Sequence, residues 1–465
     1  MIKKFKIYNT LEKKKVQFVP VDSSNIRVYA CGPTVYNYAH IGNARMAVVC
    51  DLLVRVLRTI YNKVTYVSNI TDIDDKIITE SNRLSLTSKE LSEKFLKIYN
   101  DDMGILGVDK PNVQPKATEY INHMIGAIEE LVKNENAYVA KNHVLFHVPS
   151  FENYGCLSRR DIDQQIAGNR IDKAPYKKHP SDFVLWKPSK KNEPYWESPW
   201  GRGRPGWHIE CSVMSAKCLG LPFDIHGGGV DLTFPHHENE IAQSCCISKD
   251  GSEPTNFARY WFHNGFVLSD GEKMSKSLGN IKLVNDLIKN YSGDTIRYSL
   301  LSSHYRQPLN WTENILDQSK INLNKFHRVL EESSDIKIEN NFKNPYFNEF
   351  LEILYDDLNT AKAFGFLNKK VNKLKLKKLE IKHLKDLIIK AGSVLGLFKN
   401  LNENLTNDLN KLKKVDNQFI QKLIDERNTA RLEKKYKLAD KIRIKINKLG
   451  VEIEDNKDGT IWKKN

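Results

Sequence analysis

The sequence predicts an α/β protein whose core is a doubly wound parallel sheet, and three observations support this. The chain has 465 residues, more than one ordinary domain needs. An apolar stretch at Arg27–Ala30 is followed by a turn and then by apolar positions at helical spacing from Ala44 to about Ile60. A β-rich segment, Val64–Ser68, follows that helix. Strand, helix and strand in this order form half of a Rossmann-like, nucleotide-binding sheet.

Composition shifts divide the rest of the chain. A segment richer in proline, aromatic and charged residues interrupts the strand–helix alternation, and we expect strands at 138–139 and 144–148 within it. After Trp311, long amphipathic helices predominate until the tail. The expected parts are the first half of the Rossmann-like domain (1–125), a connective insertion (126–200), the second half of that domain (201–265), the region of a lysine-rich loop (266–310), an α-helical bundle (311–400), and a linker with a small C-terminal domain (401–465).

Finer expectations concern the last third of the chain. Breaks are expected at Glu331–Asp335 and at 340–341, and another helix pair is expected to begin near Thr360. Residues 402–413 are polar and are expected to form a linker. In the tail we expect helices at Phe419–Leu432 and Ala439–Leu449, a cap at Gly450, and short strands at 451–453 and 460–462.

The junction between the first predicted strand and helix carries His40, Gly42 and Asn43. Free N–H groups and the helix dipole attract phosphate at such a helix start, and a small residue lets phosphate approach the backbone. Helix starts that contain glycine are common. Taken alone, this one therefore indicates an anion site only weakly.

A second segment, Lys273–Ser277, follows the turn-forming residues Ser269–Gly271. Its two lysines, Lys273 and Lys276, carry ammonium groups that could follow charge during phosphoryl chemistry. Lysine-rich loops are also common. The interest of this segment lies in its occurrence together with the His40 junction.

The chain contains seven cysteines and has no apolar run long enough to span a membrane. Its charged first residues are not followed by the apolar core of a signal peptide. We therefore expect a cytoplasmic location, where cysteines serve as free thiols or metal ligands rather than in disulfides. The cysteines are Cys31, Cys50, Cys156, Cys211, Cys218, Cys245 and Cys246.

Residue types suited to a metal ion occur at two places along the chain. Cys31 lies nine positions before His40, at the expected mouth of the phosphate site. Downstream, a proline favours a helix start near His236, which would place His236 and Glu240 one turn apart on one face. With Cys211, these residues offer two thiolates, an imidazole and a carboxylate, a donor set suited to tetrahedral zinc.

Two alternatives stay open at this point. An isolated cysteine is most often a small buried apolar residue, and no local Cys-x-x-Cys pair is present. The helix could also direct His237 or Glu238 towards the metal in place of His236 and Glu240. The remaining five cysteines are expected to be core or incidental residues, with Cys50 in the first helix.

In this order along the chain, the His40–Asn43 and Lys273–Ser277 segments resemble the signature pair of class I aminoacyl-tRNA synthetases. Longer strings narrow the resemblance to the cysteinyl-tRNA synthetase family and cover essentially the whole chain. The matching strings are Tyr29–Tyr36, His40–Arg45, Asn69–Lys76, Asp182–Lys187, Gly203–Ser212, His226–Leu232, Phe234–Glu240 and Lys273–Asn280.

The resemblance implies ATP-dependent ligation of L-cysteine to its cognate tRNA through a cysteinyl-adenylate. It also implies one Zn²⁺ per chain that selects the cysteine thiol, ATP accompanied by Mg²⁺, and no editing domain. The expected partners are cysteine tRNA, L-cysteine and ATP, with no membrane, and the chain is expected to be a monomer. The zinc ligands that the resemblance implies are Cys31, Cys211, His236 and Glu240.

The resemblance assigns further roles to single positions. Asn43 stands where many class I enzymes have a second histidine. The residues expected around the bound cysteine are Thr71, Trp207 and His226; those expected at ATP are His40, Gly42, Asn43, Gly228, Asp231, Lys273 and Lys276. Local chemistry alone leaves Trp207 open as a core residue and the glycine run at 227–229 open as a tight turn.

The formal net charge of +15 favours a polyanionic partner, although a lysine-biased composition gives the same charge without one. Basic residues crowd the last two predicted helices, where phosphates could be held and an aromatic ring could stack on a base. By resemblance, the residues that contact the anticodon are Arg431, Tyr436, Asp440 and Asp455. Two other functions stay open: a cysteine ligase with a small amine acceptor, and an inactive RNA-binding paralogue.

Overall fold

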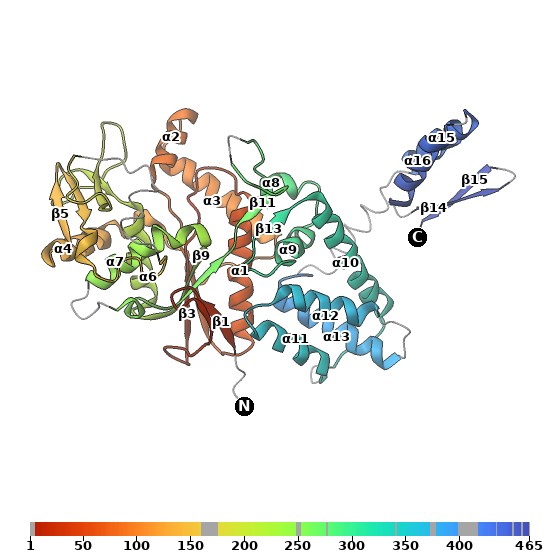
Figure 1. The fold of residues 1–465 in the computed structure, drawn as a ribbon, viewed down its shortest axis with the longest axis horizontal. Helices are drawn as coiled ribbons and strands as arrows, with labels where there is room; N and C mark the ends of the chain where they lie inside the picture. The colour runs from red at the N-terminus through yellow and green to blue at the C-terminus, as the bar shows by residue number, and fades with distance from the viewer. Residues whose placement is uncertain are drawn as a thin grey trace. The chain divides into compact units, whose positions relative to one another are not determined.

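A computed structural model of the chain shows two compact units, Met1–Lys399 and Asn400–Asn465, which are described separately (Figure 1). The described residues are 5–159, 175–247, 253–275, 278–339, 342–372, 378–398, 417–433, 435–448, 451–456 and 459–464. Within these ranges, helices that combine sufficient length with sufficient apolar character to cross a membrane are absent.

The first unit is organised around a parallel sheet with the strand order β10-β9-β3-β4. Its strands are buried almost throughout, as expected for a parallel sheet covered on both faces. Helices α1 and α6 pack against it. The elements are β3 (Ile26–Ala30), α1 (Ile41–Arg58), β4 (Val64–Ser68), α6 (Trp207–Leu219), β9 (Phe223–Gly229) and β10 (Ala258–Asn264).

This sheet confirms the predicted fold class. The predicted strand at Val64–Ser68 has the observed bounds, and the sheet resumes with β9 and β10 as expected. The first helix begins at Ile41 rather than at Ala44, because the His40 side chain caps it and the preceding residues already have helical geometry. Cys50 is buried in this helix, as expected.

A second sheet, antiparallel in the order β5-β6-β7-β8, has its first three strands within the predicted insertion at 126–200 and its last strand just beyond it. The predicted strand at 144–148 ends earlier, at Phe146, because a short 3₁₀ turn containing Pro149 follows. The elements before and within this region are α2 (Asp75–Leu84), α3 (Ser88–Ile105), η1 (Ala117–Tyr120), α4 (Ile121–Lys133), β5 (Ala137–Ala140), β6 (His143–Phe146), η2 (Val148–Ser150), β7 (Phe183–Pro188) and β8 (Gly203–Pro205).

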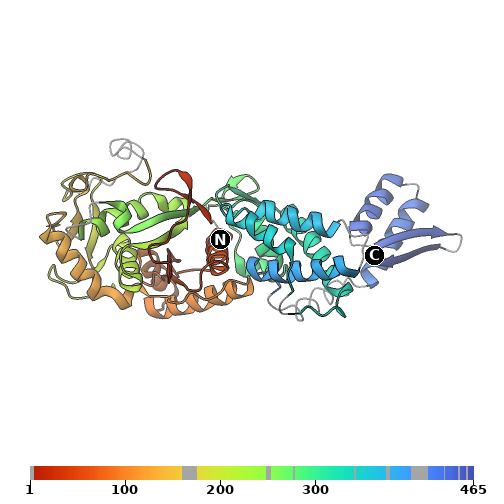
Figure 2. The ribbon, with the colours of Figure 1, turned by 90° about the horizontal axis from the view of Figure 1, so that it is seen from below.

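A third, small sheet in the order β12-β11-β13 carries Lys273 at its edge, and helices follow it. Helices α11, α12 and α13 lie side by side with α10 as a bundle, which confirms the predicted helical part (Figures 1 and 2). The elements are β11 (Val267–Ser269), β12 (Glu272–Lys273), α8 (Val284–Leu287), α9 (Gly293–Leu301), β13 (Leu309–Trp311), α10 (Glu313–Glu332), α11 (Pro345–Tyr355), α12 (Thr360–Asn372) and α13 (Lys378–Leu395).

Five further elements belong to the described part of the first unit. A hairpin of β1 and β2 packs beside β10, and helix α7 packs on α6. The predicted helix start at His236 is confirmed, and Cys245 lies further along the same helix. The bounds are β1 (Lys6–Asn9), β2 (Lys14–Gln17), η3 (Val230–Thr233), α7 (His236–Ile247) and η4 (Pro254–Asn256).

The second unit is a helix pair followed by an antiparallel hairpin. The two helices and the two short strands are found where expected, except that the second helix begins at Tyr436 rather than at Ala439. Its core contains Leu423, Ile424, Ile446 and Ile453. The predicted breaks at 340–341, the linker at 402–413 and the cap at Gly450 lie outside the described residues. The elements are α15 (Asn417–Leu432), α16 (Tyr436–Lys448), β14 (Val451–Asn456) and β15 (Gly459–Lys464).

A buried ion pair ties the parallel sheet to the helical bundle. The Asp51 carboxylate on α1 pairs with Arg297 on α9, and both side chains are almost fully buried. Arg297 also donates to the Leu395 carbonyl oxygen at the end of α13, 2.5 Å away. Arg55 donates to the same Asp51 oxygen at 2.8 Å. The ion pair therefore joins α1 to α9, and Arg297 connects both to the end of α13.

Asp51→Asn is expected to lower the free energy of unfolding by about 3 kcal/mol or more, because it leaves the buried Arg297 cation without its anionic partner. Urea-induced unfolding followed by circular dichroism measures the change. Asp101→Asn is the control, since Asp101 pairs with Lys97 at an exposed site on α3 and should cost less than about 1 kcal/mol. Equal losses in the two variants would contradict the role given to the buried pair.

Candidate metal and nucleotide site

The candidate metal donors come from three separate parts of the chain. Cys31 follows β3 directly, at the carboxyl edge of the parallel sheet. Cys211 lies on α6, and His236 and Glu240 lie one turn apart on α7. All four side chains are buried. The fold thus brings the four predicted ligands to one place between the sheet edge and two packed helices.

The distances among these donors are short enough for one ion. Cys31 Sγ lies 3.6 Å from Cys211 Sγ and 3.6 Å from Glu240 Oε1. His236 Nε2 lies 3.1 Å from Glu240 Oε1. One donor atom from each of the four residues lies within 4.8 Å of all the others. The structure therefore brings together the complete predicted ligand set.

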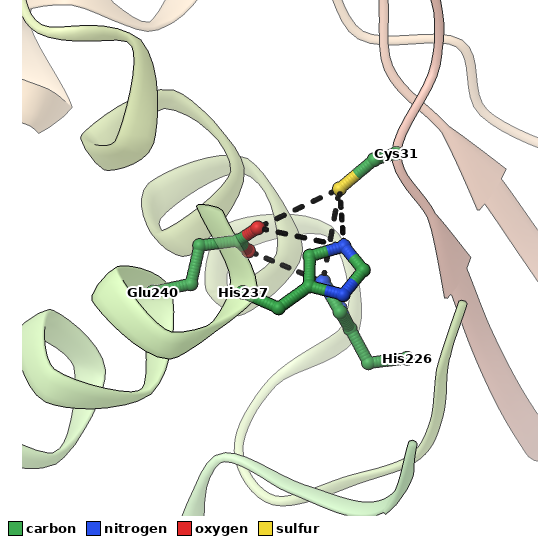
Figure 3. A group of neighbouring side chains, drawn as sticks. All are labelled: Cys31, His226, His237 and Glu240. Carbon is green, nitrogen blue, oxygen red and sulfur yellow. Dashed lines mark hydrogen bonds and ion pairs between the residues drawn. The ribbon is translucent and has the colours of Figure 1, made fainter. Parts of the chain in front are cut away.

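A second set of donors overlaps the first and shares Cys31 and Glu240 with it. Figure 3 shows Cys31, His226, His237 and Glu240 pointing towards one another. Cys31 Sγ lies 3.4 Å from His237 Nε2 and 3.8 Å from His226 Nε2. The alternative ligand His237 is therefore also beside the Cys31 sulfur, and the structure does not separate it from the cluster.

Glu238, the other alternative ligand on this helix, has a different role. Its carboxylate is fully buried and accepts hydrogen bonds from the backbone N–H groups of Gly155 at 3.0 Å and Ser158 at 2.8 Å. It is not part of either donor set. Glu238 therefore holds the loop that follows η2 against α7.

The protonation states and unsatisfied atoms of these residues fit a bound cation. Burial raises the pKa of the Cys31 and Cys211 thiols and of the Glu240 carboxyl group. Burial also lowers the pKa of His236 well below its ordinary value, so the contact with Glu240 is not an ion pair of charged groups. Within the described part of the chain, the approaches of His236 Nε2 to Glu240 Oε1 and of His226 Nε2 to Glu240 Oε2 are close but lack hydrogen-bond geometry, so His236 Nε2 and Glu240 Oε2 have no hydrogen-bond partner. A divalent cation would satisfy both atoms and favour deprotonated thiols.

Two aromatic residues on α6 position the His236 ring. His236 Nδ1 lies 2.8 Å from His208 Nδ1, and Trp207 stacks on His236 with a 4.0 Å distance between ring centroids. Burial lowers the pKa of His208 to about 4, so one ring must donate to the other. If His236 donates from Nδ1, its Nε2 lone pair points into the donor cluster.

His208 was not among the site residues predicted from the sequence, and neither was the contact between the His237 and His263 rings. His237 Nδ1 lies 2.7 Å from His263 Nε2, and His263 Nδ1 lies 2.8 Å from the Thr10 hydroxyl. His208 could have been found from its place three residues before Cys211, a spacing of one helical turn. His263 and Thr10 carry no such local signal, because they meet only in the folded chain.

Asn69 contacts the Cys211 thiol, and Thr71 contacts the residue before Cys211. The Thr71 hydroxyl donates to Glu210 Oε2 at 2.9 Å, and Asn69 Oδ1 lies 3.6 Å from Cys211 Sγ. His226, expected near the same substrate, is 3.2 Å from Glu240 Oε2. Of the three residues expected around a bound cysteine, His226 contacts the donor cluster, Trp207 stacks on His236 while remaining partly exposed, and Thr71 contacts Glu210, the residue before Cys211.

The start of α1 is held by a reciprocal cap. His40 Nδ1 accepts from the backbone N–H groups of Gly42 at 3.1 Å and Asn43 at 3.3 Å. Asn43 Oδ1 accepts from the His40 backbone N–H at 3.1 Å. Burial lowers the pKa of His40, so the ring is neutral at pH 7 and its proton is on Nε2. His40 can therefore donate from Nε2 to an anion.

Residues at the end of β9 lie near this cap. The Asp231 carboxylate in η3 is close enough to His40 to raise the pKa of its imidazole against the effect of burial. The glycine run at 227–229 forms the end of strand β9 rather than a tight turn. A Cβ at Gly228 would lie 2.8 Å from His237 Cε1, so a glycine at this position allows close packing against α7. The structure brings His40, Gly42, Gly228 and Asp231 to the same edge of the sheet.

The chain that follows the lysine-rich segment is hydrogen-bonded to the start of α1. The Ile41 N–H donates to the Lys282 carbonyl at 2.9 Å, and the Val284 N–H donates to the Ala39 carbonyl at 2.9 Å. Lys273 is exposed at the end of β12. Lys276 and Ser277 lie outside the described residues.

The residues predicted to contact the anticodon lie in the second unit. Arg431 is near the end of α15, Tyr436 begins α16, and Asp440 follows one turn later. All three side chains are exposed, with Tyr436 61% exposed. The Asp455 side chain lies outside the described part of the structure.

His208→Ala is expected to weaken metal binding about 10-fold to 100-fold, because it removes the group that orients the His236 ring. Competition with a chromophoric chelator measures the affinity of the purified chain for Zn²⁺. His123→Ala serves as the control, since His123 is exposed on α4 and is not part of a donor set. Unchanged affinity in the His208 variant would show that the ring contact does not orient a ligand.

Comparison with known proteins agrees with this geometry. Residues 17–321 match the family described as the tRNA synthetases class I (C) catalytic domain, and residues 349–399 match the DALR domain family. A cysteine–tRNA ligase from Parvibaculum lavamentivorans is 48% identical, covering 99% of this chain and 98% of that protein. One from Maricaulis maris is 47% identical, with 98% of each covered.

A comparison with solved structures finds proteins of similar fold. The solved structure of Mycobacterium tuberculosis methionyl-tRNA synthetase with methionyl-adenylate has a TM-score of 0.57. It is 14% identical and covers 85% of this chain and 95% of that chain, so the likeness concerns the fold alone. Given the two family matches and the close relatives along nearly its full length, the chain belongs to the cysteine–tRNA ligase family of class I tRNA synthetases.

Proposed function

We propose that this chain ligates L-cysteine to its cognate tRNA in two ATP-dependent steps. The cysteine carboxylate first attacks the α-phosphate of ATP to give cysteinyl-adenylate and pyrophosphate. A terminal ribose hydroxyl of the tRNA then takes the cysteinyl group. The observation that carries this proposal is the buried cluster of Cys31, Cys211, His236 and Glu240 in a chain 48% identical to a named cysteine–tRNA ligase.

For the metal we propose Zn²⁺, with Cys31, Cys211, His236 and Glu240 as its ligands. Two sulfur, one nitrogen and one oxygen donor suit zinc, and the unpartnered His236 and Glu240 atoms support this choice. When bound, zinc supplies a coordination position that prefers a thiolate to a neutral hydroxyl. Rejecting serine by ~10⁴ requires roughly 5.5 kcal/mol, more than a pocket of fitted shape provides for such a small difference.

We assign the phosphates of ATP to the start of α1 and to the lysine-rich segment. His40 donates from Nε2, Gly42 leaves room for a phosphate at the helix start, and the Asn43 amide group adds N–H donors. Lys273 and Lys276 neutralise charge that develops on the phosphates. These groups act by position and charge rather than by acid–base chemistry, and Mg²⁺ is proposed to accompany ATP.

The remaining contacts follow from the same edge of the sheet. Gly228 and Asp231 are proposed to bind adenosine, with the carboxylate accepting from a ribose hydroxyl. Thr71, Trp207 and His226 are proposed to surround the cysteine side chain. In the second unit, the proposed anticodon contacts are Arg431, Tyr436, Asp440 and Asp455, which suit a chain with a net charge of +15.

The proposal extends to organisation and setting. We retain the six-part division at 125, 200, 265, 310 and 400, a cytoplasmic location and a monomeric state as predictions. A cysteine ligase with a small amine acceptor is less well supported, because the similar tRNA ligases match this chain along nearly all its length, its tail included. An inactive paralogue is less well supported because every donor in the cluster is present.

The test is attachment of radiolabelled cysteine to cysteine tRNA with ATP, beside serine at the same concentration. We expect the chain to charge tRNA with cysteine and to leave serine uncharged. Cysteine-dependent pyrophosphate exchange without tRNA charging would show that the acceptor is wrong. Failure of both reactions in zinc-loaded protein would contradict the proposed function.

Cys211→Ser is expected to lower both zinc content and cysteine-dependent pyrophosphate exchange by about 100-fold, because a neutral hydroxyl is a poor zinc ligand. Metal analysis and exchange kinetics measure the two effects. The control is Cys218→Ser, on the same helix but outside the donor set, which should retain both properties. Unchanged metal content and exchange in the Cys211 variant would contradict the ligand assignment.

A further inference from the structure

Arg45 is fully buried on α1, two residues after Asn43. Its guanidinium group donates five hydrogen bonds to neutral oxygen atoms. Nη1 donates to the carbonyl oxygens of Gly265 at 3.0 Å and Phe266 at 2.8 Å. Nη2 donates to the Ser303 hydroxyl at 3.0 Å and to the carbonyl oxygens of His304 at 3.3 Å and Gln307 at 2.8 Å.

Among the residues that the structure describes, this cation has no carboxylate partner. Across the described ranges, Arg45 makes no ion pair with an aspartate or glutamate. Burial lowers the pKa of Arg45 to about 10, so the group remains charged at neutral pH. Among the described residues Arg45 Nε has no hydrogen-bond partner, and a buried charge without a counter-ion is costly even where the other donors are satisfied. A purely stabilising role would be better filled by an apolar side chain.

The five acceptors lie on two separate backbone segments. Gly265 and Phe266 lead directly into β11, and the segment Ser303–Gln307 leads towards β13. The segments also contact each other, because the Gly265 N–H donates to the Tyr305 carbonyl at 2.8 Å and the Leu309 N–H to the Phe266 carbonyl at 2.9 Å. A Cβ at Gly265 would lie 2.6 Å from the Gln307 carbonyl oxygen. Arg45 thus binds both segments where they lie closest together.

These two segments determine the place of the small sheet. Strand β11 pairs with β13 in parallel and with β12 in antiparallel orientation. Lys273 is the last residue of β12 and pairs with Leu268 of β11. The position of Lys273 relative to α1 therefore depends on where the two segments are held on that helix.

We propose that Arg45 is a positioning residue that fixes the β12-β11-β13 sheet, and with it Lys273, relative to His40 on the same helix. This inference rests on the proposed function, in which His40 and Lys273 act on the same phosphates. The planar guanidinium group suits the task because it can donate to carbonyls of two segments in one plane. An ammonium group has three tetrahedral donors and cannot reproduce the five bonds.

The test uses Arg45→Lys and Arg45→Met in the full-length chain loaded with zinc. We expect kcat for cysteine-dependent pyrophosphate exchange to fall about 10-fold to 100-fold in both variants, because a shift of about 1 Å between reacting groups has effects of this size. The KM for cysteine and the zinc content should not change, since the metal donors do not contact Arg45. This split between kcat and KM separates positioning from a general loss of folded protein.

Hydrogen exchange gives a second readout that does not depend on activity. Amides of β11 and β13 should exchange faster in both variants, whereas amides of β3 and β9 should not. Arg27→Lys is the control. Arg27 also donates to two carbonyls, those of Leu219 and Pro222 at 2.7 Å each, but on a different loop. It should leave both kcat and the exchange of β11 and β13 unchanged.

The outcomes are distinct. If both kcat and the amide hydrogen exchange of β11 and β13 in Arg45→Lys match those of the unmodified chain, the inference is overturned. This holds whether or not Arg45→Met folds. A lower melting temperature with unchanged kcat per folded molecule would show a structural role only and would also overturn it. If the unmodified chain shows no pyrophosphate exchange, the proposed function fails. In that case the amide hydrogen exchange of β11 and β13 still decides whether Arg45 positions the sheet.

Discussion

The burial of unlike metal donors around one point is the constraint on which the site depends. Cys31 comes from the sheet edge, Cys211 from α6, and His236 and Glu240 from α7. Without a cation, burial opposes charge on both thiols and on the carboxyl group. Packing must therefore hold these groups together at a cost in stability, and binding of a divalent cation would offset that cost. The contacts of Trp207 and His208 with His236 also hold the His236 ring in place beside the other donors.

The parallel sheet explains why the candidate metal donors and the proposed nucleotide site lie together. Cys31 and the His40 cap both follow β3, and Gly228 and Asp231 lie at the end of the neighbouring strand β9. Because β3 and β9 are parallel, their carboxyl ends share one edge, where open α/β sheets bind ligands. Helix α1 then links this edge to the rest of the first unit. It carries the cap at its start, Arg45 in its first half and Asp51 further along.

Much of this could be predicted from the sequence, for reasons that differ between elements. Periodicity located the strand at 64–68, and residue chemistry with Pro235 singled out Cys31, Cys211, His236 and Glu240 as candidate donors, which the fold brings together. The start of α1 was misplaced because histidine is an uncommon helix cap, and its bond to Asn43 depends on local geometry. His263 and Thr10 could not be predicted, because their contact joins residues far apart in the sequence. Choosing between His236 and His237 was also beyond the sequence, and even in the fold both imidazoles lie close to shared donors.

The central claim is that this buried cluster binds a metal through thiolates and takes the thiol of the substrate. Absorption spectroscopy of the Co²⁺-substituted chain tests it most directly, because thiolate-to-cobalt charge transfer reports the number of bound sulfur atoms. We predict one Co²⁺ per chain with a tetrahedral, thiolate-rich spectrum that gains charge-transfer intensity when cysteine is added and does not change with serine. A chain that binds no Co²⁺, or a spectrum that cysteine leaves unchanged, would contradict the account.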